Sequence, residues 1–338
     1  MKAVRAHRHG APDVLVVEDV PTPRPGAGEI LVRVESAAVN YADLVRRRND
    51  PYPFPTTLPY TPGSEVAGTV EELGAGVEGP PPGTSVFALV GADGSTGYAQ
   101  YAVAAAPQVV PIPPGLTPDE AAAVVVAGTT ALLTLTEVGR LAAGETVLIE
   151  GAGGGVGGFA VQIAKLLGAT VVAAAATPAR RAAARALGAD HVVDYTAPGW
   201  TDAVREATGG RGADVVLEIA GGTTFTDALS VLAPFGRVVV AGMAGRTPLR
   251  LDDDTVRSLF YDPALNQSLR TFNLGAYFGL APGTAVGALR TLVEHVAAGR
   301  VTVPVGLVLP LSRAAEAHRL VEERRTTGKV VLKPWLAA

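Results

Sequence analysis

The hydrophobic pattern of the chain changes twice along its length. Up to about residue 115 the chain is rich in Pro and Gly, and short runs alternate apolar and polar positions, as in "EILVRVESAAV" (29–39) and "GTVEELG" (68–74). Alternation of this kind between turn residues is typical of half-buried strands. The stretch 49–63 holds five prolines and no periodicity. We therefore expect a loop there, and long loops in compact domains are often functional.

From about residue 120 the pattern predicts alternating helices and strands. The predicted strands consist almost entirely of Val, Ile, Leu and Ala, which is typical of a parallel sheet covered by helices on both faces, a doubly wound α/β domain. Strands are expected at 146–150, 170–176, 191–194, 213–219, 236–242 and about 269–276, and helices at 120–138, 155–167, 178–187, 200–207 and 223–232. Two further helices precede a last short strand and are expected at 284–298 and 312–325, the strand at 329–332.

The turn after the first of these strands contains a run of glycines. In "LIEGAGGGVGGFAVQIAKLLGATVV" (148–172), a strand leads into "GAGGGVGG" and then into a helix. Glycines at such a turn let the backbone approach a pyrophosphate, and the helix N-terminus offers free N–H groups and positive dipole. Two registers of the dinucleotide fingerprint fit, namely Gly153, Gly155 and Gly158, or Ala152, Gly154 and Gly157. Either register predicts a dinucleotide-binding site.

The end of the second predicted strand indicates which dinucleotide binds. A site for NAD places Asp or Glu there to hold the ribose 2′-hydroxyl, but residues 173–176 are all alanine. Thr177 can cap the following helix, and Arg180 and Arg181 lie in its first turn, where a guanidinium can pair with a phosphate. We therefore expect NADP(H); the alternative is that the two arginines are a solvated helix face.

Composition limits the classes of function. The chain has 338 residues, 48% of them apolar and 18% charged, enough to bury the cores of two ordinary domains. A net charge of −4 without a basic stripe argues against nucleic acid as a partner. The start lacks the apolar core of a signal peptide, and no apolar run reaches the roughly 18 residues of a membrane span, so we expect a cytoplasmic protein. Without cysteine, and with five histidines scattered singly, we expect no metal site.

Several sequence motifs spread along the chain occur together in one known protein family. Besides the glycine turn they include "AAVNYADLVRR" (37–47), "PYTPGSEVAGTVEELGAGV" (59–77), "GADHVVDY" (188–195) and "AEAHRLVEERRTTGKVVL" (315–332). With them the chain resembles the medium-chain dehydrogenase/reductase superfamily, specifically its zinc-free NADPH:quinone oxidoreductase branch, which includes zeta-crystallin. The resemblance implies a Rossmann domain that binds NADPH (122–278), inserted into a β-rich GroES-like catalytic domain (1–121 and 279–338).

The resemblance also implies roles for single residues. It selects the second fingerprint register, with Ala152, Gly154, Gly155, Val156 and Gly157 at the pyrophosphate. Asn40 is expected to orient the substrate oxygen or the nicotinamide carboxamide, and Tyr52 to donate a proton or a hydrogen bond; the alternatives are a turn-closing amide and a loop-packing ring. The other residues expected at the cofactor are Thr129, Thr177, Arg180, Arg181, Tyr195, Gly242, Gly328 and Lys329, of which Lys329 is alternatively a solvated side chain.

One departure from the zinc-containing relatives bears on the chemistry. Zinc alcohol dehydrogenases carry Gly-His-Glu where this chain has Gly63, Ser64 and Glu65, and a serine cannot replace an imidazole ligand. Without a Lewis acid, removing hydride from an alcohol loses its main driving force. A quinone or an enone accepts hydride directly, and its oxygen needs only hydrogen-bond donors and a proton. The sequence therefore predicts reduction of quinones or activated C=C bonds, with Glu65 as a buried structural carboxylate.

Alternatives to this function and to the assembly remain open. The chain is alternatively an enoyl reductase for a carrier-bound or CoA-bound substrate, or a non-catalytic NADPH-binding protein. A homodimer is expected through the strand at 269–276, which comes last in the sheet and would leave an apolar edge open. The alternative is a monomer in which the unpatterned segment 243–268 covers that edge.

Overall fold

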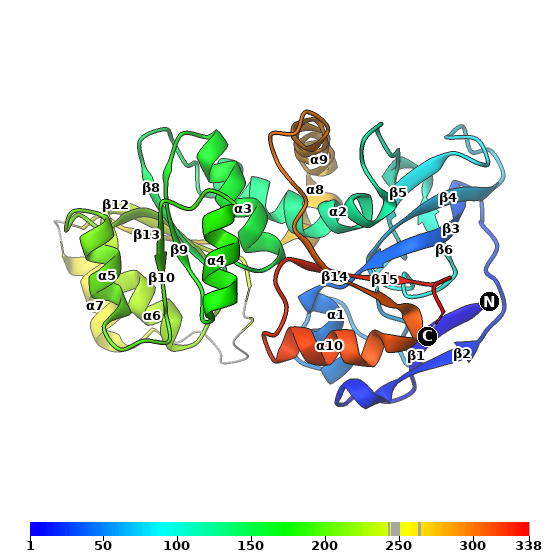
Figure 1. The fold of residues 1–338 in the computed structure, drawn as a ribbon, viewed down its shortest axis with the longest axis horizontal. Coiled ribbons are helices and arrows are strands. Elements are labelled where there is room, and N and C mark those ends of the chain that lie inside the picture. The colour runs from blue at the N-terminus through cyan, green and yellow to red at the C-terminus, as the bar shows by residue number, and fades with distance from the viewer. Residues whose placement is uncertain (243, 245–250, 263–264, 338) are drawn as a thin grey trace. The chain divides into compact units, whose positions relative to one another are not determined.

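The computed structural model describes residues 1–242, 244, 251–262 and 265–337. The chain forms two compact units, one made of Met1–Ala127 and Val303–Ala338 and the other of Gly128–Thr302 (Figure 1). The domain bounds expected from the sequence, with a second boundary near 279, stay a prediction.

The first unit is built around a seven-stranded sheet in the order β14-β15-β3-β4-β5-β7, with β6 paired to β3. A separate two-stranded sheet pairs β1 (Lys2–Ala6) with β2 (Leu15–Asp19). The strands of the larger sheet are β3 (Glu29–Ala38), β4 (Glu65–Leu73), β5 (Ser85–Leu89), β6 (Tyr101–Ala105), β7 (Val109–Pro111), β14 (Val305–Pro310) and β15 (Lys329–Lys333). Helices α1 (Tyr41–Arg48) and α10 (Ala314–Glu322) belong to the same unit.

The last strand shows how the two ends of the chain come together in this unit. β15 pairs antiparallel with β3, with Val331 opposite Ala38. Its side chains Val330, Val331 and Leu332 are buried. The sequence "KVVL" therefore joins the sheet of the N-terminal strands and not the parallel sheet, as the discontinuous arrangement requires.

The second unit is a doubly wound sheet of six parallel strands in the order β10-β9-β8-β11-β12-β13. Figure 1 shows helices on both faces, with α3 and α4 on one side and α5 and α6 on the other. The strands are β8 (Thr146–Glu150), β9 (Thr170–Ala174), β10 (His191–Val193), β11 (Ala213–Glu218), β12 (Leu232–Val240) and β13 (Ser268–Thr271). The helices are α3 (Gly155–Leu166), α4 (Pro178–Ala186), α5 (Trp200–Ala207), α6 (Thr223–Ser230), α7 (Asp253–Tyr261), α8 (Leu274–Leu280) and α9 (Pro282–Ala297). The predicted fold class is thus confirmed, and the strand order reverses between β8 and β11, where such sheets bind ligands.

Two predictions about the edge of this sheet were wrong. The strand expected at 269–276 ends at Thr271, because the side chain of Asn273 accepts a hydrogen bond from the N–H of Ala276 (3.1 Å) and caps α8. The segment 243–268, expected to be unpatterned, contains α7, which Asp252 caps by accepting from the N–H of Thr255 (2.8 Å). Part of that segment (243, 245–250 and 263–264) lies outside the described residues.

Helix α2 (Pro118–Leu133) continues through one π-helical turn to Val138. By length and composition it would be able to cross a membrane, with a mean hydropathy of 1.7 in its most apolar window. However, 78% of that window is buried inside the protein, which is what a core helix of the same composition would show.

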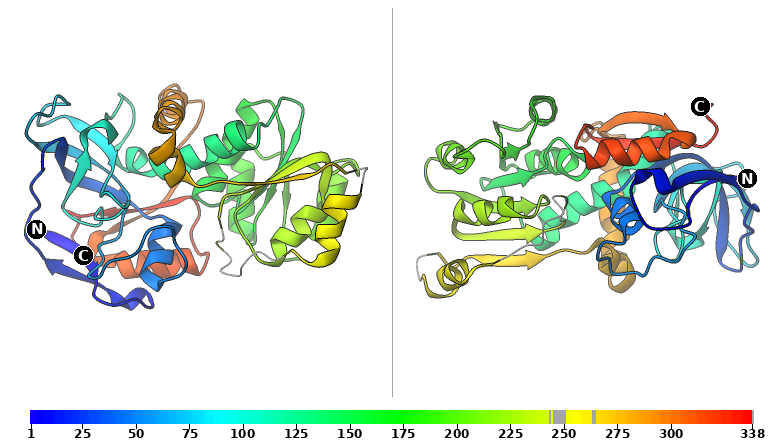
Figure 2. Two further views of the ribbon diagram at one scale, coloured as in Figure 1. Left: turned by 180° about the vertical axis from the view of Figure 1, so that it is seen from behind. Right: turned by 90° about the horizontal axis from the view of Figure 1, so that it is seen from below.

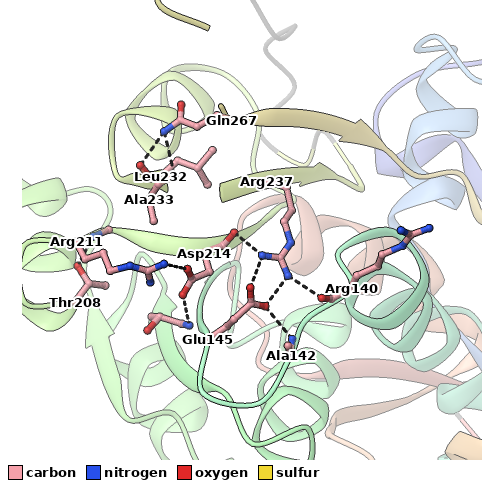
Figure 3. A network of polar contacts seen from close by, with 12 residues as sticks. Arg140, Ala142, Glu145, Thr208, Arg211, Asp214, Leu232, Ala233, Arg237 and Gln267 are labelled. Atoms are coloured by element: carbon pink, nitrogen blue, oxygen red, sulfur yellow. Dashed lines mark hydrogen bonds and ion pairs between the residues drawn. The ribbon is translucent and has the colours of Figure 1, made fainter. Parts of the chain in front are cut away.

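The amino ends of β8, β11 and β12 are joined by an ion-pair network (Figure 3). The guanidinium of Arg237 donates to both carboxylate oxygens of Glu145 (2.7 and 2.6 Å). Its remaining donors reach the carbonyl oxygens of Gly139, Arg140 and Asp214. The Asp214 carboxylate in turn pairs with Arg211 (2.7 Å). All five N–H donors of a largely buried arginine are thereby satisfied.

Candidate functional site

The glycine turn follows β8 and begins α3. Gly154 is the N-cap of α3, and Gly155 and Val156 open its first turn, where N–H groups lack acceptors within the helix. A Cβ atom at Gly157 would lie 2.3 Å from the carbonyl oxygen of Gly151, so only glycine fits there. Ala152 is buried and its N–H donates to the carbonyl of Ala174 in β9 (3.2 Å). The turn is therefore packed tightly against the sheet, with the N-terminus of a helix above it.

The start of α4 lies against this turn. A Cβ atom at Gly153 would meet Cβ of Arg180 at 2.6 Å. Thr177 caps α4 by accepting from the N–H of Arg180 (3.3 Å). The side chain of Arg181 pairs with Asp194 (2.6 Å) and also donates to the carbonyl of Ala175 (3.1 Å). The structure thus brings both arginines next to the end of β9 and places Arg180 beside the glycine turn.

Three more expected cofactor residues belong to the same unit. Thr129 is fully buried in α2, and among the described residues its hydroxyl has no hydrogen-bond partner. Tyr195 packs at the edge of the hydrophobic core that includes Val193. Gly242 follows β12, with its backbone close to Ile219. A buried hydroxyl without a partner is costly unless a ligand or water satisfies it.

The first unit contains a buried polar cluster centred on Lys329. Its ammonium group donates to Glu65 (2.8 Å), to the side-chain oxygen of Asn40 (2.6 Å) and to the carbonyl of Val39 (3.0 Å). The amide nitrogen of Asn40 donates to Glu65 (2.9 Å) and Ser64 (3.3 Å). Lys329 is only 4% exposed, so the alternative of a solvated lysine is wrong. The contact of Asn40 with a substrate or carboxamide stays a prediction, since its amide is already bonded within the protein.

Asp43 holds in place the two chain segments that carry this cluster. Its carboxylate accepts hydrogen bonds from the N–H of Asn40 (2.9 Å), the N–H of Gly63 (3.1 Å) and the hydroxyl of Tyr98 (3.1 Å). Burial raises the pKa of Asp43 to about 6, while these hydrogen bonds oppose the shift. Because it ties α1 to the loop at Gly63, Asp43 positions both Asn40 and the Ser64–Glu65 pair.

Tyr52 belongs to a group of aromatic rings around Arg46. The guanidinium of Arg46 lies 5.4 Å from the ring of Tyr52 and 4.7 Å from that of Tyr60, and binds the Asp93 carboxylate (2.5 Å). Burial raises the pKa of Tyr52, so its phenol keeps its proton at neutral pH. A phenol in this setting can donate a hydrogen bond to an oxygen that gains negative charge.

Tyr60 was missed by sequence reasoning. Its ring is 3% exposed, and its hydroxyl has no hydrogen-bond partner within the part of the chain that the structure describes. The available signal was its place in "PYTPG", at the end of the proline-rich loop that also carries Tyr52. Gly328, by contrast, has φ of 62° and packs so closely on Pro304 that a Cβ atom would lie 2.0 Å from that carbonyl oxygen. Close packing on Pro304 explains why position 328 is a glycine. The contact of Gly328 with a cofactor stays a prediction.

Comparisons with known proteins agree with this architecture. Residues 26–114 match the alcohol dehydrogenase GroES-like domain, and residues 187–332 match a family described as zinc-binding dehydrogenase. The chain is 32% identical to the quinone oxidoreductase of Sus scrofa over 335 residues, covering 98% of this chain and 97% of that one. It is 33% identical to a 2-haloacrylate reductase of Burkholderia over 336 residues, covering 97% of each.

Among solved structures, the Escherichia coli quinone oxidoreductase complexed with NADPH superposes with a TM-score of 0.90 at 26% identity, covering 99% of this chain and 100% of that one. The discontinuous first sheet, the parallel sheet with its glycine turn and these relationships lead to one conclusion: the chain belongs to the medium-chain dehydrogenase/reductase superfamily, in its zeta-crystallin-like quinone oxidoreductase branch.

Proposed function

We propose that this oxidoreductase uses NADPH to reduce quinones or the activated C=C bond of enones, and that it needs no metal. The observation that carries the proposal is the buried ion pair of Lys329 with Glu65 (2.8 Å). It occupies the Ser64–Glu65 position, where zinc-containing members of the superfamily have Gly-His-Glu. The related quinone oxidoreductases and the 2-haloacrylate reductase, by their names, act on such acceptors.

The residues at that position do not fit a zinc ion. Glu65 already accepts from Lys329, Asn40 and the N–H of Val126 (2.6 Å), and an ammonium group beside it repels a dication. Ser64 supplies no imidazole. Across the described residues, no group of three or more His, Cys, Asp and Glu side chains is arranged to hold a metal ion. These facts support a reaction in which protein hydrogen-bond donors alone stabilise the developing oxyanion.

The second unit offers a fit for NADPH. The turn at Ala152, Gly154 and Gly157 provides the close backbone approach and helix N-terminus that a pyrophosphate requires. Arg180 and Arg181 are proposed to bind the 2′-phosphate, because β9 itself ends in alanines and not in the Asp or Glu of an NAD site. To do so, Arg181 would exchange its ion pair with Asp194 for the phosphate. The buried Thr129 hydroxyl, which has no hydrogen-bond partner among the described residues, is proposed to bind the nicotinamide ribose. When bound, the dinucleotide supplies the hydride.

On the substrate side we assign the donor role to Tyr52. Tyr52 lies in the loop at 49–63, and its ring stacks on the guanidinium of Arg46 from α1. Tyr52 is 36% exposed, so a small molecule can reach its phenol. The Arg46 cation stabilises negative charge that builds up on an oxygen bound to the phenol. Asn40 is proposed to orient the substrate or carboxamide from the Lys329 cluster.

The direct test is a steady-state panel of NADPH against 1,4-benzoquinone, an alkyl enone and an enoyl thioester, each with and without a chelator. We expect turnover of the quinone or the enone that the chelator does not change. Preference for the enoyl thioester would identify the protein as an enoyl reductase. NADPH binding without turnover of any acceptor would support a non-catalytic role, and loss of turnover that zinc restores would contradict metal independence.

We also propose a cytoplasmic homodimer that forms through β13, the edge strand of the parallel sheet. Leu269 in β13 is 42% exposed, and large apolar side chains nearby in sequence are more exposed still, with Tyr261 at 80% and Leu280 at 88%. A second copy paired on this edge would cover such a surface. Light scattering should give twice the 34.4 kDa chain mass, and Leu269→Lys should shift it to one chain. A single-chain mass for the unmodified protein would contradict the dimer.

A further inference from the structure

Two carboxyl groups lie side by side at the point where the strand order of the parallel sheet reverses. Glu150 is the last residue of β8 and Glu218 is the last residue of β11. The two strands are neighbours, with Ile149 opposite Leu217, so the two glutamates are adjacent. Both are 0% exposed. Each glutamate directly precedes a turn at the carboxyl ends of the strands: Glu150 precedes the glycine turn at Gly151, and Glu218 precedes the turn 219–222.

The hydrogen bonds of this pair are incomplete without a proton. One oxygen of Glu150 accepts from the N–H of Ala220 (3.2 Å), and one oxygen of Glu218 accepts from the N–H of Gly221. The second oxygen of each side chain is buried, and no donor reaches it from the described residues. An ionised carboxylate can only accept hydrogen bonds. A single proton held between the two carboxyl groups gives both remaining oxygens a partner.

No cation of the residues that the structure describes neutralises the pair. The strands beside it, β9 and the carboxyl half of β12, present Ala and Val side chains there. The charged groups on the packed elements are bonded elsewhere: Lys165 of α3 to Asp190, Arg237 of β12 to Glu145, and Asp227 of α6 to the Trp200 indole. Burial, and then the charge of Glu218, raise the pKa of Glu150 well above its ordinary value. Burial also raises the pKa of Glu218.

We propose that Glu150 and Glu218 share one proton at neutral pH and act as positioning residues for the dinucleotide, so that NADPH affinity falls when this proton is lost. The proposal rests on the proposed NADPH function. The protonated pair bonds β8 to β11 and holds Ala220 and Gly221 in place at the start of the turn before α6. Loss of the proton sets two carboxylates against each other and adds a negative charge next to the glycine turn assigned to the pyrophosphate. By linkage, binding of the anionic cofactor favours the protonated pair.

The shared proton is tested first on the protein without cofactor. A carboxyl group whose pKa is raised by folding contributes stability that is complete below its unfolded pKa and is lost as pH rises through its folded pKa. The unmodified protein should therefore lose stability as pH rises above about 4.3, the ordinary pKa of Glu. Glu150→Gln keeps the acceptor for Ala220 and supplies a permanent donor for Glu218. Its Tm should fall less over the same range, whereas the exposed control Glu206→Gln should follow the unmodified protein.

The effect on cofactor binding is measured by titration calorimetry with NADPH. Between about pH 7 and pH 9.5 we expect the Kd of the unmodified protein and of Glu206→Gln to rise about tenfold, and that of Glu150→Gln to rise less than about threefold. Equal pH dependence for all three proteins would overturn the coupling. Parallel Tm profiles would overturn the shared proton. Absence of NADPH binding at every pH would instead reject the proposed function, since the Tm profiles do not depend on the cofactor.

Discussion

At the amino ends of the parallel sheet, Arg237 directs its five donors at Glu145 and at three main-chain carbonyls (Figure 3). At the carboxyl ends of the same strands, Glu150 and Glu218 face each other, and the described part of the chain places no cation beside them. Figure 2 shows the same sheet from two further sides. The two ends are made from the same strands, so propensity does not distinguish them. One end satisfies its buried charge within the chain and stabilises the fold, and the other keeps glycines and acidic groups that stable packing alone does not require.

The largest effect on stability is expected from disrupting the Arg237 network at the amino ends of the strands. Arg237→Gln removes the partner of Glu145 and leaves three carbonyl oxygens short of a donor, so we expect a loss of about 3 to 5 kcal/mol in the free energy of unfolding. Urea unfolding measures it. The matched control is Arg211→Gln, whose arginine is 60% exposed and should cost less than about 1 kcal/mol. Similar small losses for both variants would show that the network does not stabilise the sheet.

The glycine turn should respond to a single methyl group. In Gly157→Ala, the new Cβ meets the carbonyl oxygen and carbon of Gly151 and Cα of Ala152, so the helix must move away from the turn. We expect NADPH affinity to fall by more than about tenfold, with a stability loss of about 1 to 3 kcal/mol. Gly287→Ala in α9 is the control, because Gly287 is exposed and nothing lies within 4 Å of its Cβ position. Comparable affinity losses for both would argue against close approach at Gly157.

Cofactor choice is expected to depend on the start of α4. Replacing Arg180 and Arg181 together by Ala should weaken NADPH by about 1 to 3 kcal/mol and leave NADH nearly unchanged, because only NADPH carries the 2′-phosphate. Steady-state KM values for the two cofactors measure this. Arg185→Ala, an exposed arginine of the same helix, should change neither. Equal losses for NADPH and NADH would show that the pair only stabilises α4.

The two ends of the sheet should also differ in the sign of their pH dependence. Hydrogen bonds from Arg237 hold the pKa of Glu145 below its ordinary value. Its contribution to stability is therefore present above its unfolded pKa and lost as pH falls through the folded pKa. Glu145→Gln should flatten the acid side of the stability profile by about 1 kcal/mol or less, and should leave the alkaline side, assigned to Glu150, unchanged. A flatter alkaline side would contradict this separation.

The sequence predicted the parts of the molecule whose determinants are local. The strand, glycine turn and helix at 146–167 follow from apolar runs and glycines, and the Ala173–Ala176 run indicated the cofactor. The predicted edge strand was too long, because the apolar residues after Asn273 form helix α8 once the Asn273 side chain caps that helix. Helix caps formed by a single Asn or Asp are weak signals in a sequence read without its fold.

Residues joined over long sequence distances were not predictable in this way. The buried ion pair of Lys329 was not predicted, because its partner, Glu65, lies 264 positions away and meets it only when β15 and β4 join one sheet. The adjacency of Glu150 and Glu218 likewise depends on the strand order, which places β8 beside β11. The motif resemblance supplied the family, but not which buried polar groups would be satisfied within the chain.

The central claim is that one end of the parallel sheet stabilises the protein while the other binds NADPH. It is tested most directly by measuring NADPH affinity and urea unfolding on two variants, Glu145→Gln and the double change of Arg180 and Arg181 to Ala. We expect Glu145→Gln to lose about 1 kcal/mol of unfolding free energy with its Kd changed less than about twofold. The double variant should lose about tenfold or more in affinity with little change in unfolding. Affinity losses of equal size in the two variants would contradict the claim.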